Sequence, residues 1–355
     1  MRIYLAPMEG VTGHVFRRVH ARCFGKADKY ITPFLSPTQE KRLTHRELQE
    51  VLPAHNEGLP VVPQILTARA ALFLWAAGEL AAMGYGEVNL NLGCPSGTVV
   101  AKGKGAGFLP RRAELTAFLD EIFARCPLPI SIKTRVGQVH PEEWAWLKEL
   151  FARYPIAELT IHPRLGRELY GGRPRWELVA GMDCHPWPVC WSGDINSPED
   201  GAALAARIPW VGAVMVGRGA VADPALLRRL SGGPPAAAEE LRAFLSQLAE
   251  EYLAILPGRT AVLHKMKELW AYLGRQCAGQ ERWLKELRKA RTMEQYHTAV
   301  AKLLTGYVPA RGENVGDALC GAGECDRISG PVGQARREEG GRDVPSGNYV
   351  QSNRL

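Results

Sequence analysis

The sequence contains no long hydrophobic run. Its 355 residues are 46% hydrophobic and 23% charged, which is ordinary for a soluble globular protein. No apolar stretch approaches the roughly 20 residues that a membrane-spanning helix requires. The N-terminal residues 1–7 enter a strand-like run directly, without the apolar core and cleavage site of a secretory signal. We therefore expect a cytoplasmic protein with no membrane segment and with enough chain for one large domain and a smaller one.

Paired cysteine motifs are absent as well. The eight cysteines contain no Cys-x-x-Cys pair, so the sequence supports neither a zinc ribbon nor a disulfide framework. Cys184, His185 and Cys190 resemble half of a metal site, but no second half follows at a suitable spacing. We expect reduced thiols and no bound metal.

Acidic residues are outnumbered by basic ones. The net charge is +7 and the isoelectric point is near 9.0, which favours an anionic partner, with nucleic acid as the first candidate. The basic excess is concentrated between Arg259 and Arg291, where nine Lys or Arg residues stand against three Glu and are interleaved with Trp270, Tyr272 and Trp283. A solvated charged helix face is the alternative explanation of this segment.

Short strand-like runs alternate with longer helical stretches up to about residue 230. The runs cover residues 3–8, 30–34, 61–66, 87–92, 130–135, 158–162, 188–192 and 213–217, and the clearest helical stretches cover 68–83, 112–124 and 198–206. Eight such units favour an α/β fold of the TIM (β/α)8 barrel type over a doubly wound sheet.

The composition changes twice after the last strand-like run. We assign residues 1–231 to the barrel and residues 236–305, which are almost free of strand signals, to a small C-terminal helical bundle. Residues 306–355 are rich in glycine and poor in periodic hydrophobics, so we expect a disordered tail there.

Residues 89–95 read Asn-Leu-Asn-Leu-Gly-Cys-Pro and form the most informative stretch of the chain. Gly93 permits a backbone path that a side chain would obstruct, and Pro95 stops the strand, so Cys94 is displaced onto a loop. The Gly- and Lys-rich residues 96–107 follow and exceed what a simple connection needs, which favours a functional or mobile loop. A small buried hydrophobe is the alternative role for Cys94.

Polar residues end most of the predicted strands, and in a TIM barrel the strand ends form the active site. The turns Ser192-Gly193-Asp194 and Gly217-Arg218-Gly219 after the last two strands are typical of phosphate sites. Amide side chains match the pyrimidine edge of a flavin, and a nearby cation stabilises its reduced anion, so these residues suit FMN. The residues with these properties are Gln64, Asn91, Lys133 and His162. A sugar-phosphate barrel is the alternative, but the carboxylates it would use are scarce here.

Six motifs together give a resemblance to a known family. They cover residues 6–12, 91–95, 132–137, 161–164, 193–195 and 215–219. In this order they resemble the tRNA-dihydrouridine synthases, FMN enzymes that reduce specific uridines of tRNA. The similarity extends over residues 1 to about 225, and the helical segment that follows is similar to the family's RNA-binding domain.

The resemblance implies a mechanism and a set of site residues. NADPH would reduce FMN, hydride would pass from flavin N5 to uracil C6, and Cys94 would donate a proton to C5; a thiol with an ordinary pKa of about 8.5 is protonated at neutral pH. The implied cofactor contacts are Pro7 and Met8 through their backbone, Gln64, Asn91, Lys133, His162, Ser192, Gly193, Asp194, Gly217 and Arg218. Arg135 would stabilise charge on the uracil oxygens, and Lys102 and Lys104 would contact tRNA phosphates.

Two residues depart from the family pattern. Ser192 stands where the family usually has asparagine, and Asn89 stands where an acidic residue is often found. Two other functions remain open: an FMN barrel acting on a small molecule, similar to a dihydroorotate dehydrogenase or an enoate reductase, and a non-catalytic RNA-binding module. A small substrate has no need of basic helices, and Cys94 and Lys133 favour catalysis. We expect a monomer.

Overall fold

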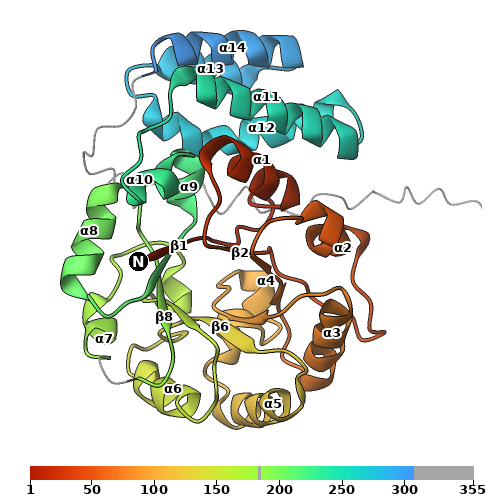
Figure 1. The fold of residues 1–355 in the computed structure, drawn as a ribbon, viewed down its shortest axis with the longest axis vertical. Helices are drawn as coiled ribbons and strands as arrows, with labels where there is room; N and C mark the ends of the chain where they lie inside the picture. Colours follow the sequence, from red (N-terminus) through yellow and green to blue (C-terminus); the bar gives the residue numbers. More distant parts are fainter. Residues whose placement is uncertain (183–184, 308–355) are drawn as a thin grey trace, which may run out of the picture. The chain divides into compact units, whose positions relative to one another are not determined.

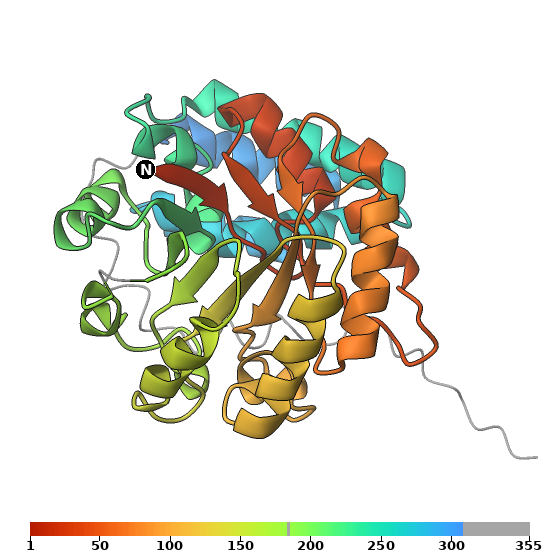
Figure 2. The same cartoon turned by 60° about the horizontal axis from the view of Figure 1, so that its bottom comes forward.

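The computed structural model describes residues 1–182 and 185–307, and within these residues lies a sheet of nine parallel strands (Figures 1 and 2). The strands are β1 (Arg2–Leu5), β2 (Lys29–Ile31), β3 (Val61–Val62), β4 (Gln64–Ile65), β5 (Val88–Leu92), β6 (Ile130–Arg135), β7 (Leu159–His162), β8 (Val189–Ser192) and β9 (Ala213–Val216). Their order is β3-β2-β1-β9-β8-β7-β6-β5-β4. All eight predicted strands are present, and the third is divided into two.

Pro63 divides the third predicted strand and closes the barrel. Proline has no backbone N–H to donate, so the ladder is interrupted at this residue. β3 pairs with β2 on one side, and β4 pairs with β5 on the other. The Pro63 carbonyl still accepts the Asn89 N–H at 2.8 Å. Because β3 and β4 are separated by one residue, the two ends of the strand order meet, which confirms the predicted barrel.

Helices surround the strands (Figure 2). They are α1 (His14–Phe24), α2 (His45–Val51), α3 (Ala70–Ala82), α4 (Gly97–Val100), α5 (Arg112–Arg125), α6 (Glu143–Phe151), α7 (Trp176–Ala180), α8 (Pro198–Arg207), α9 (Arg218–Ala222) and α10 (Leu226–Leu230), with the 3-10 turns η1 (Pro53–His55), η2 (Gly105–Phe108) and η3 (Gly166–Glu168). The predicted helices correspond to α3, α5 and α8. Ser197 caps α8 as expected, since its side chain accepts the Asp200 N–H at 3.2 Å.

A polar cluster around the buried Glu158 lies at the N-terminal end of the barrel. Glu158 accepts hydrogen bonds from Arg2 at 3.0 Å and from the Tyr4 hydroxyl at 2.8 Å, and it pairs with Lys29 at 3.3 Å. These partners satisfy the charge of Glu158, whose side chain is 5% exposed. In a TIM barrel the active site forms at the opposite, C-terminal end of the strands.

Four further helices follow the barrel. They are α11 (Ala238–Ile255), α12 (Arg259–Leu273), α13 (Glu281–Lys289) and α14 (Met293–Thr305), with η4 (Gly274–Gln276) between α12 and α13. Figure 1 shows them gathered beside α1. The ring of Phe244 on α11 lies 5.8 Å from that of Phe16 and 5.2 Å from that of Phe24, both on α1. The barrel and these helices share one hydrophobic core.

The domain limits at residues 231 and 236 remain a prediction. The shared hydrophobic core includes residues on both sides of these limits. The predicted tail lies outside the described residues from residue 308 onward. Within residues 1–182 and 185–307, no helix has both the length and the apolar character to cross a membrane.

Replacing Phe244 with alanine should destabilise the barrel and the C-terminal helices together. The substitution removes a buried ring that contacts α1, so we expect a loss of about 3–5 kcal/mol in the free energy of unfolding. Denaturant unfolding followed by circular dichroism should show one transition. Leu253→Ala, on the exposed face of the same helix, is the matched control and should cost under about 0.5 kcal/mol. Two separate transitions would show instead that the segments fold independently.

Candidate active site

The strand register brings the predicted polar residues to the C-terminal end of the barrel. Asn91 on β5 lies level with Lys133 on β6, and Arg135 at the end of β6 lies level with His162 at the end of β7. Successive residues of a strand point to opposite faces, so Lys133 and Arg135, two residues apart, share the inward face. The barrel therefore places an amide, two cations and an imidazole around one mouth.

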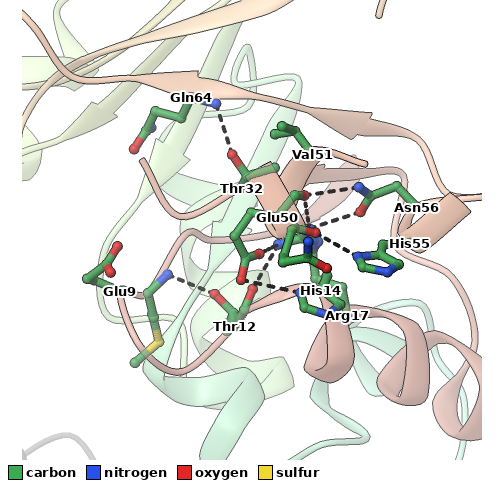
Figure 3. Close-up of polar contacts among 12 residues, drawn as sticks. Glu9, Thr12, His14, Arg17, Thr32, Glu50, Val51, His55, Asn56 and Gln64 are labelled. Atoms are coloured by element: carbon green, nitrogen blue, oxygen red, sulfur yellow. Dashed lines mark hydrogen bonds and ion pairs between the residues drawn. The ribbon is translucent and has the colours of Figure 1, made fainter. Parts of the chain in front are cut away.

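The two amides are held in a defined arrangement. Asn91 Oδ1 accepts the N–H groups of Gly93 at 3.0 Å and of Cys94 at 2.9 Å. Asn91 Nδ2 donates to Gln64 Oε1 at 2.7 Å. The Gln64 backbone N–H donates to Thr32 Oγ1 at 3.0 Å (Figure 3). Asn91 thus fixes the turn that carries the Cys94 thiol.

Cys94 is half-buried at the end of β5, and its thiol stays protonated at neutral pH. Burial raises the pKa of Cys94, against the lowering effects of the Ser96 backbone N–H and of the Arg135 and Lys133 charges. A cysteine nucleophile requires the opposite shift, toward the thiolate. The arrangement therefore suits a proton donor.

The Gly- and Lys-rich loop after Cys94 is folded against the barrel. It forms α4 and η2, and Ala106, Phe108 and Leu109 are buried. A Cβ at Gly105 would lie 2.7 Å from the Cys94 carbonyl oxygen, so close packing requires glycine there. The glycines of this segment allow its tight contacts with the barrel.

Arg135 supports the backbone on both sides of the site. Its Nε donates to the Gly93 carbonyl at 3.0 Å, and its Nη1 donates to the Leu165 carbonyl at 2.8 Å. Burial lowers the pKa of Arg135 to about 10 and that of Lys133 to about 8. Both side chains remain mainly cationic at neutral pH. Arg135, predicted as a substrate contact, is thus also a clamp that holds the Cys94 turn.

His162 is neutral and acts as a hydrogen-bond acceptor at Nε2. Its pKa lies well below the ordinary value, first because it is buried and then because Arg135, Lys133, Arg164 and Arg218 surround it. Arg164 Nη1 lies 3.1 Å from His162 Nε2. Because a guanidinium can only donate, the imidazole proton must sit on Nδ1, where it is free to serve a ligand.

Asp194 joins two arginines at the predicted phosphate site. Its carboxylate accepts from Arg164 Nη1 at 3.0 Å and from Arg218 Nη2 at 2.9 Å. The Asp194 side chain therefore orients both guanidinium groups, and the phosphate site remains a prediction. Sequence reasoning missed Arg164 as a site residue, although the motif of residues 161–164 contained it.

Two glycines line this region closely. A Cβ at Gly193 would lie 3.0 Å from His162 Cδ2, and a Cβ at Gly217 would lie 3.3 Å from Ala6 Cβ. Ser192 is buried at the end of β8, level with Met215 of β9. The predicted phosphate residues therefore gather at one place, next to His162.

Hydrogen bonds of Thr12 and Arg17 hold the β1–α1 loop in place. Met8 N–H donates to Thr12 Oγ1 at 2.8 Å, and the Met8 carbonyl accepts the N–H groups of Val11 and Thr12. Both backbone groups of Met8 thus have partners within the loop, and the expected backbone contact of Pro7 and Met8 with a flavin remains a prediction. Buried Arg17 donates to the Thr12 carbonyl at 3.1 Å and to Glu50 at 2.9 Å (Figure 3).

Tyr170 was not predicted, yet it lies over the cations of the mouth. Its ring centre is 4.6 Å from the Arg218 guanidinium carbon and 5.6 Å from that of Arg135, and the side chain is 45% exposed. No local signal marks it, since it follows β7 in an irregular loop. An exposed aromatic ring over cations can stack on a planar ligand.

The predicted loop lysines differ in exposure. Lys102 is exposed, whereas Lys104 is half-buried and donates to Ser36 Oγ at 3.1 Å. Burial, together with the nearby Lys102 and Arg69 charges, lowers the pKa of Lys104. These cations therefore lie close together on the rim beside the Cys94 turn.

The half metal site suggested by the sequence is only partly described. Cys184 lies outside the described residues, Cys190 is buried inside the barrel on β8, and the His185 ring stacks on Trp187 at 5.7 Å. The residues that the structure describes contain no group of three or more potential metal ligands.

Residues 4–305 match the family model described as dihydrouridine synthase. The chain belongs to the dihydrouridine synthase family. The resemblance expected from the six motifs is confirmed, as is the expectation of an enzyme of this family.

Curated relatives carry related names. "Probable tRNA-dihydrouridine synthase" from Staphylococcus aureus strain COL is 32% identical over 231 residues, which are 62% of this chain and 68% of that protein. "Probable tRNA-dihydrouridine synthase 1" from Synechocystis sp. is 32% identical over 235 residues, 64% of this chain and 63% of that protein. Among solved structures, the old yellow enzyme homologue from Zymomonas mobilis has a TM-score of 0.48 at 14% identity and covers 66% of this chain and 90% of that chain.

The Cys94 thiol should resist alkylation until well into the alkaline range. Its raised pKa means that the reactive thiolate forms at higher pH than in an ordinary cysteine, whose pKa is about 8.5. Iodoacetamide labelling across a pH series, quantified on the Cys94 peptide by mass spectrometry, should give a midpoint above that of glutathione measured alongside. A midpoint below that of glutathione would contradict the protonated thiol.

Proposed function

We propose that this protein reduces specific uridines of tRNA to 5,6-dihydrouridine, with FMN as bound cofactor and NADPH as reductant. The observation that carries the proposal is the half-buried, protonated thiol of Cys94 at the barrel mouth, beside Lys133 and Arg135, in a chain of the dihydrouridine synthase family. The tRNA substrate is supported by the names of the relatives.

The residues at the mouth fit FMN. Arg218 has N–H groups beyond the one that Asp194 accepts, so it can offer charge-assisted hydrogen bonds to a phosphate, and buried Arg164 holds Asp194 beside it. Gln64, Asn91 and Lys133 provide amide groups and a cation for the polar edge of the ring, and His162 provides its Nδ1–H. When bound, FMN would supply the hydride for uracil C6.

Cys94 would complete the reduction. Hydride addition at C6 breaks the π bond between C5 and C6 and leaves an enolate on C5 and O4 of the uracil. The Cys94 thiol then donates its proton to C5, and the resulting thiolate regains a proton from solvent. Lys133 and Arg135 would stabilise the negative charge on the uracil oxygens in this water-poor mouth.

A uridine within tRNA must leave its base stack to reach the mouth. Lys102 and Lys104 on the rim would contact the flanking phosphates, so RNA binding should depend on salt. The basic helical segment offers fewer free cations than its sequence suggests. Lys265 donates to the Gly10 carbonyl, and Lys267 donates to the Ala290 carbonyl at 2.9 Å.

Family membership does not favour the alternative of an FMN barrel acting on a small molecule. The preference for NADPH, the monomeric state and the cytoplasmic location remain predictions. Reduction rates with NADPH and NADH test the cofactor preference, light scattering tests the monomeric state, and cell fractionation tests the location.

Cys94→Ala should abolish most tRNA reduction while leaving FMN bound. General acid catalysis is worth about 10²–10⁴-fold in rate, so we expect a loss of that order. The assay incubates protein, NADPH and unmodified tRNA and quantifies dihydrouridine by mass spectrometry. Cys126→Ala, another half-buried cysteine, is the matched control. Full activity in Cys94→Ala would refute the proton-donor role, and no product from FMN-loaded wild type with any tRNA would refute the function.

Lys102→Ala should weaken tRNA binding because the variant has one cation fewer to place on a phosphate. The slope of log K against log salt should become shallower by roughly one, the value expected for a single lysine–phosphate pair. Fluorescence anisotropy with labelled tRNA over a salt series measures this slope. Arg153→Ala is the control, because Arg153 precedes β7 at the opposite end of the barrel. An unchanged slope in Lys102→Ala would show that this rim does not bind the RNA.

A further inference from the structure

Four buried side chains form a continuous hydrogen-bonded line across the barrel interior. Asn89 Nδ2 donates to Ser131 Oγ at 2.9 Å, Gln64 Nε2 donates to Asn89 Oδ1 at 2.7 Å, and Asn91 Nδ2 donates to Gln64 Oε1 at 2.7 Å. The line ends where Asn91 Oδ1 accepts the Cys94 N–H at 2.9 Å. We call it the amide relay; it spans strands β4, β5 and β6.

The backbone sets the direction of the amide relay. At one end the N–H groups of Gly93 and Cys94 can only donate, so Asn91 must present its oxygen to them. Asn91 then presents its nitrogen to Gln64, and Gln64 presents its nitrogen to Asn89. At the other end the Ser131 hydroxyl faces the Val88 carbonyl, which can only accept. Each amide therefore has one orientation that satisfies both of its neighbours.

Burial makes this direction costly to reverse. Gln64 is fully buried, and Asn89 and Ser131 are 1% and 2% exposed, so water cannot replace a missing partner. Flipping either amide would oppose donor to donor or acceptor to acceptor in a low-dielectric interior. The relay thus leaves the second N–H of Asn91, a residue that is 7% exposed, as the group available to a ligand.

We infer that Asn89 and Ser131 are positioning residues that hold the Gln64 and Asn91 amides, and through Asn91 the Cys94 turn, in the orientation used in the reaction. This inference rests on the proposed function, because it assumes that Gln64 and Asn91 face the flavin or the base. Neither Asn89 nor Ser131 needs to touch a ligand. They act through the side chains of Gln64 and Asn91, to which they are linked by hydrogen bonds.

The relay explains how asparagine can replace an acidic residue at position 89. An aspartate there would accept the Gln64 Nε2–H as asparagine does, and the Ser131 hydroxyl would rotate to donate to it. The orientation of Gln64 would be unchanged. A leucine of similar size would leave Gln64 Nε2 without its acceptor and free the amide to flip.

The test compares Asn89→Asp, Asn89→Leu and Ser131→Ala in the full chain. The control is Thr160→Val, which removes a buried hydroxyl on β7 outside the relay. For each variant we would measure kcat and KM for tRNA, bound FMN, the visible flavin spectrum and the iodoacetamide labelling rate of Cys94. The thermal midpoint of each variant identifies those that fail to fold.

The relay predicts that Asn89→Leu lowers kcat by about tenfold or more with little change in KM, shifts the flavin spectrum and speeds Cys94 labelling. Asn89→Asp and Thr160→Val should stay within about threefold of wild type, with unchanged spectra. Ser131→Ala should fall between. If Asn89 only fills space in the core, Asn89→Leu should keep near wild-type activity and Asn89→Asp should lose it, because the aspartate buries a charge. That result would overturn the inference.

Failure of the proposed function gives a different result. If wild type reduced no tRNA, the flavin spectrum and Cys94 labelling would still rank the variants. A change in both for Asn89→Leu, with a smaller change for Ser131→Ala and none for Asn89→Asp, would support the relay without the reaction. Identical spectra and labelling rates in all folded variants would overturn the relay, whether or not tRNA is reduced.

Discussion

Concentrated positive charge at the barrel mouth is the constraint on which the rest of the site depends. Lys133, Arg135, Arg164 and Arg218 all lie near enough to His162 to lower its pKa. Asp194 pairs with two of them. Buried cations in such excess are costly without anions, so the mouth favours an anionic ligand. Burial, together with this charge, lowers the pKa of His162 and keeps the imidazole neutral, and burial keeps the nearby thiol protonated.

Much of the barrel could be predicted because parallel strands buried on both faces appear as short apolar runs. All eight runs are strands in the structure, and Pro63 divides one of them as proline must. Gln64, Asn91 and Lys133 could be recognised because each interrupts such a run with a polar group near its C-terminal end. In a closed barrel that position alone brings them together.

Other features depend on contacts between distant segments, which no local pattern contains. Arg164 becomes a site residue through Asp194, thirty positions away, and Tyr170 through its place over Arg218. The glycines after Cys94 serve close packing that only the folded loop reveals. Lys265 is one of the nine basic residues that make residues 259–291 basic in the sequence. In the structure its ammonium group donates to a backbone carbonyl of the β1–α1 loop.

The most direct test of this account compares the affinity of the flavin-free protein for FMN and for riboflavin, which lacks the phosphate. Isothermal titration at fixed ionic strength measures both. Charge-assisted hydrogen bonds from Arg218 to a phosphate predict that FMN binds roughly a hundredfold tighter or more. Equal affinities would contradict a phosphate site at Arg218 and, with it, the assignment of the charged mouth to FMN.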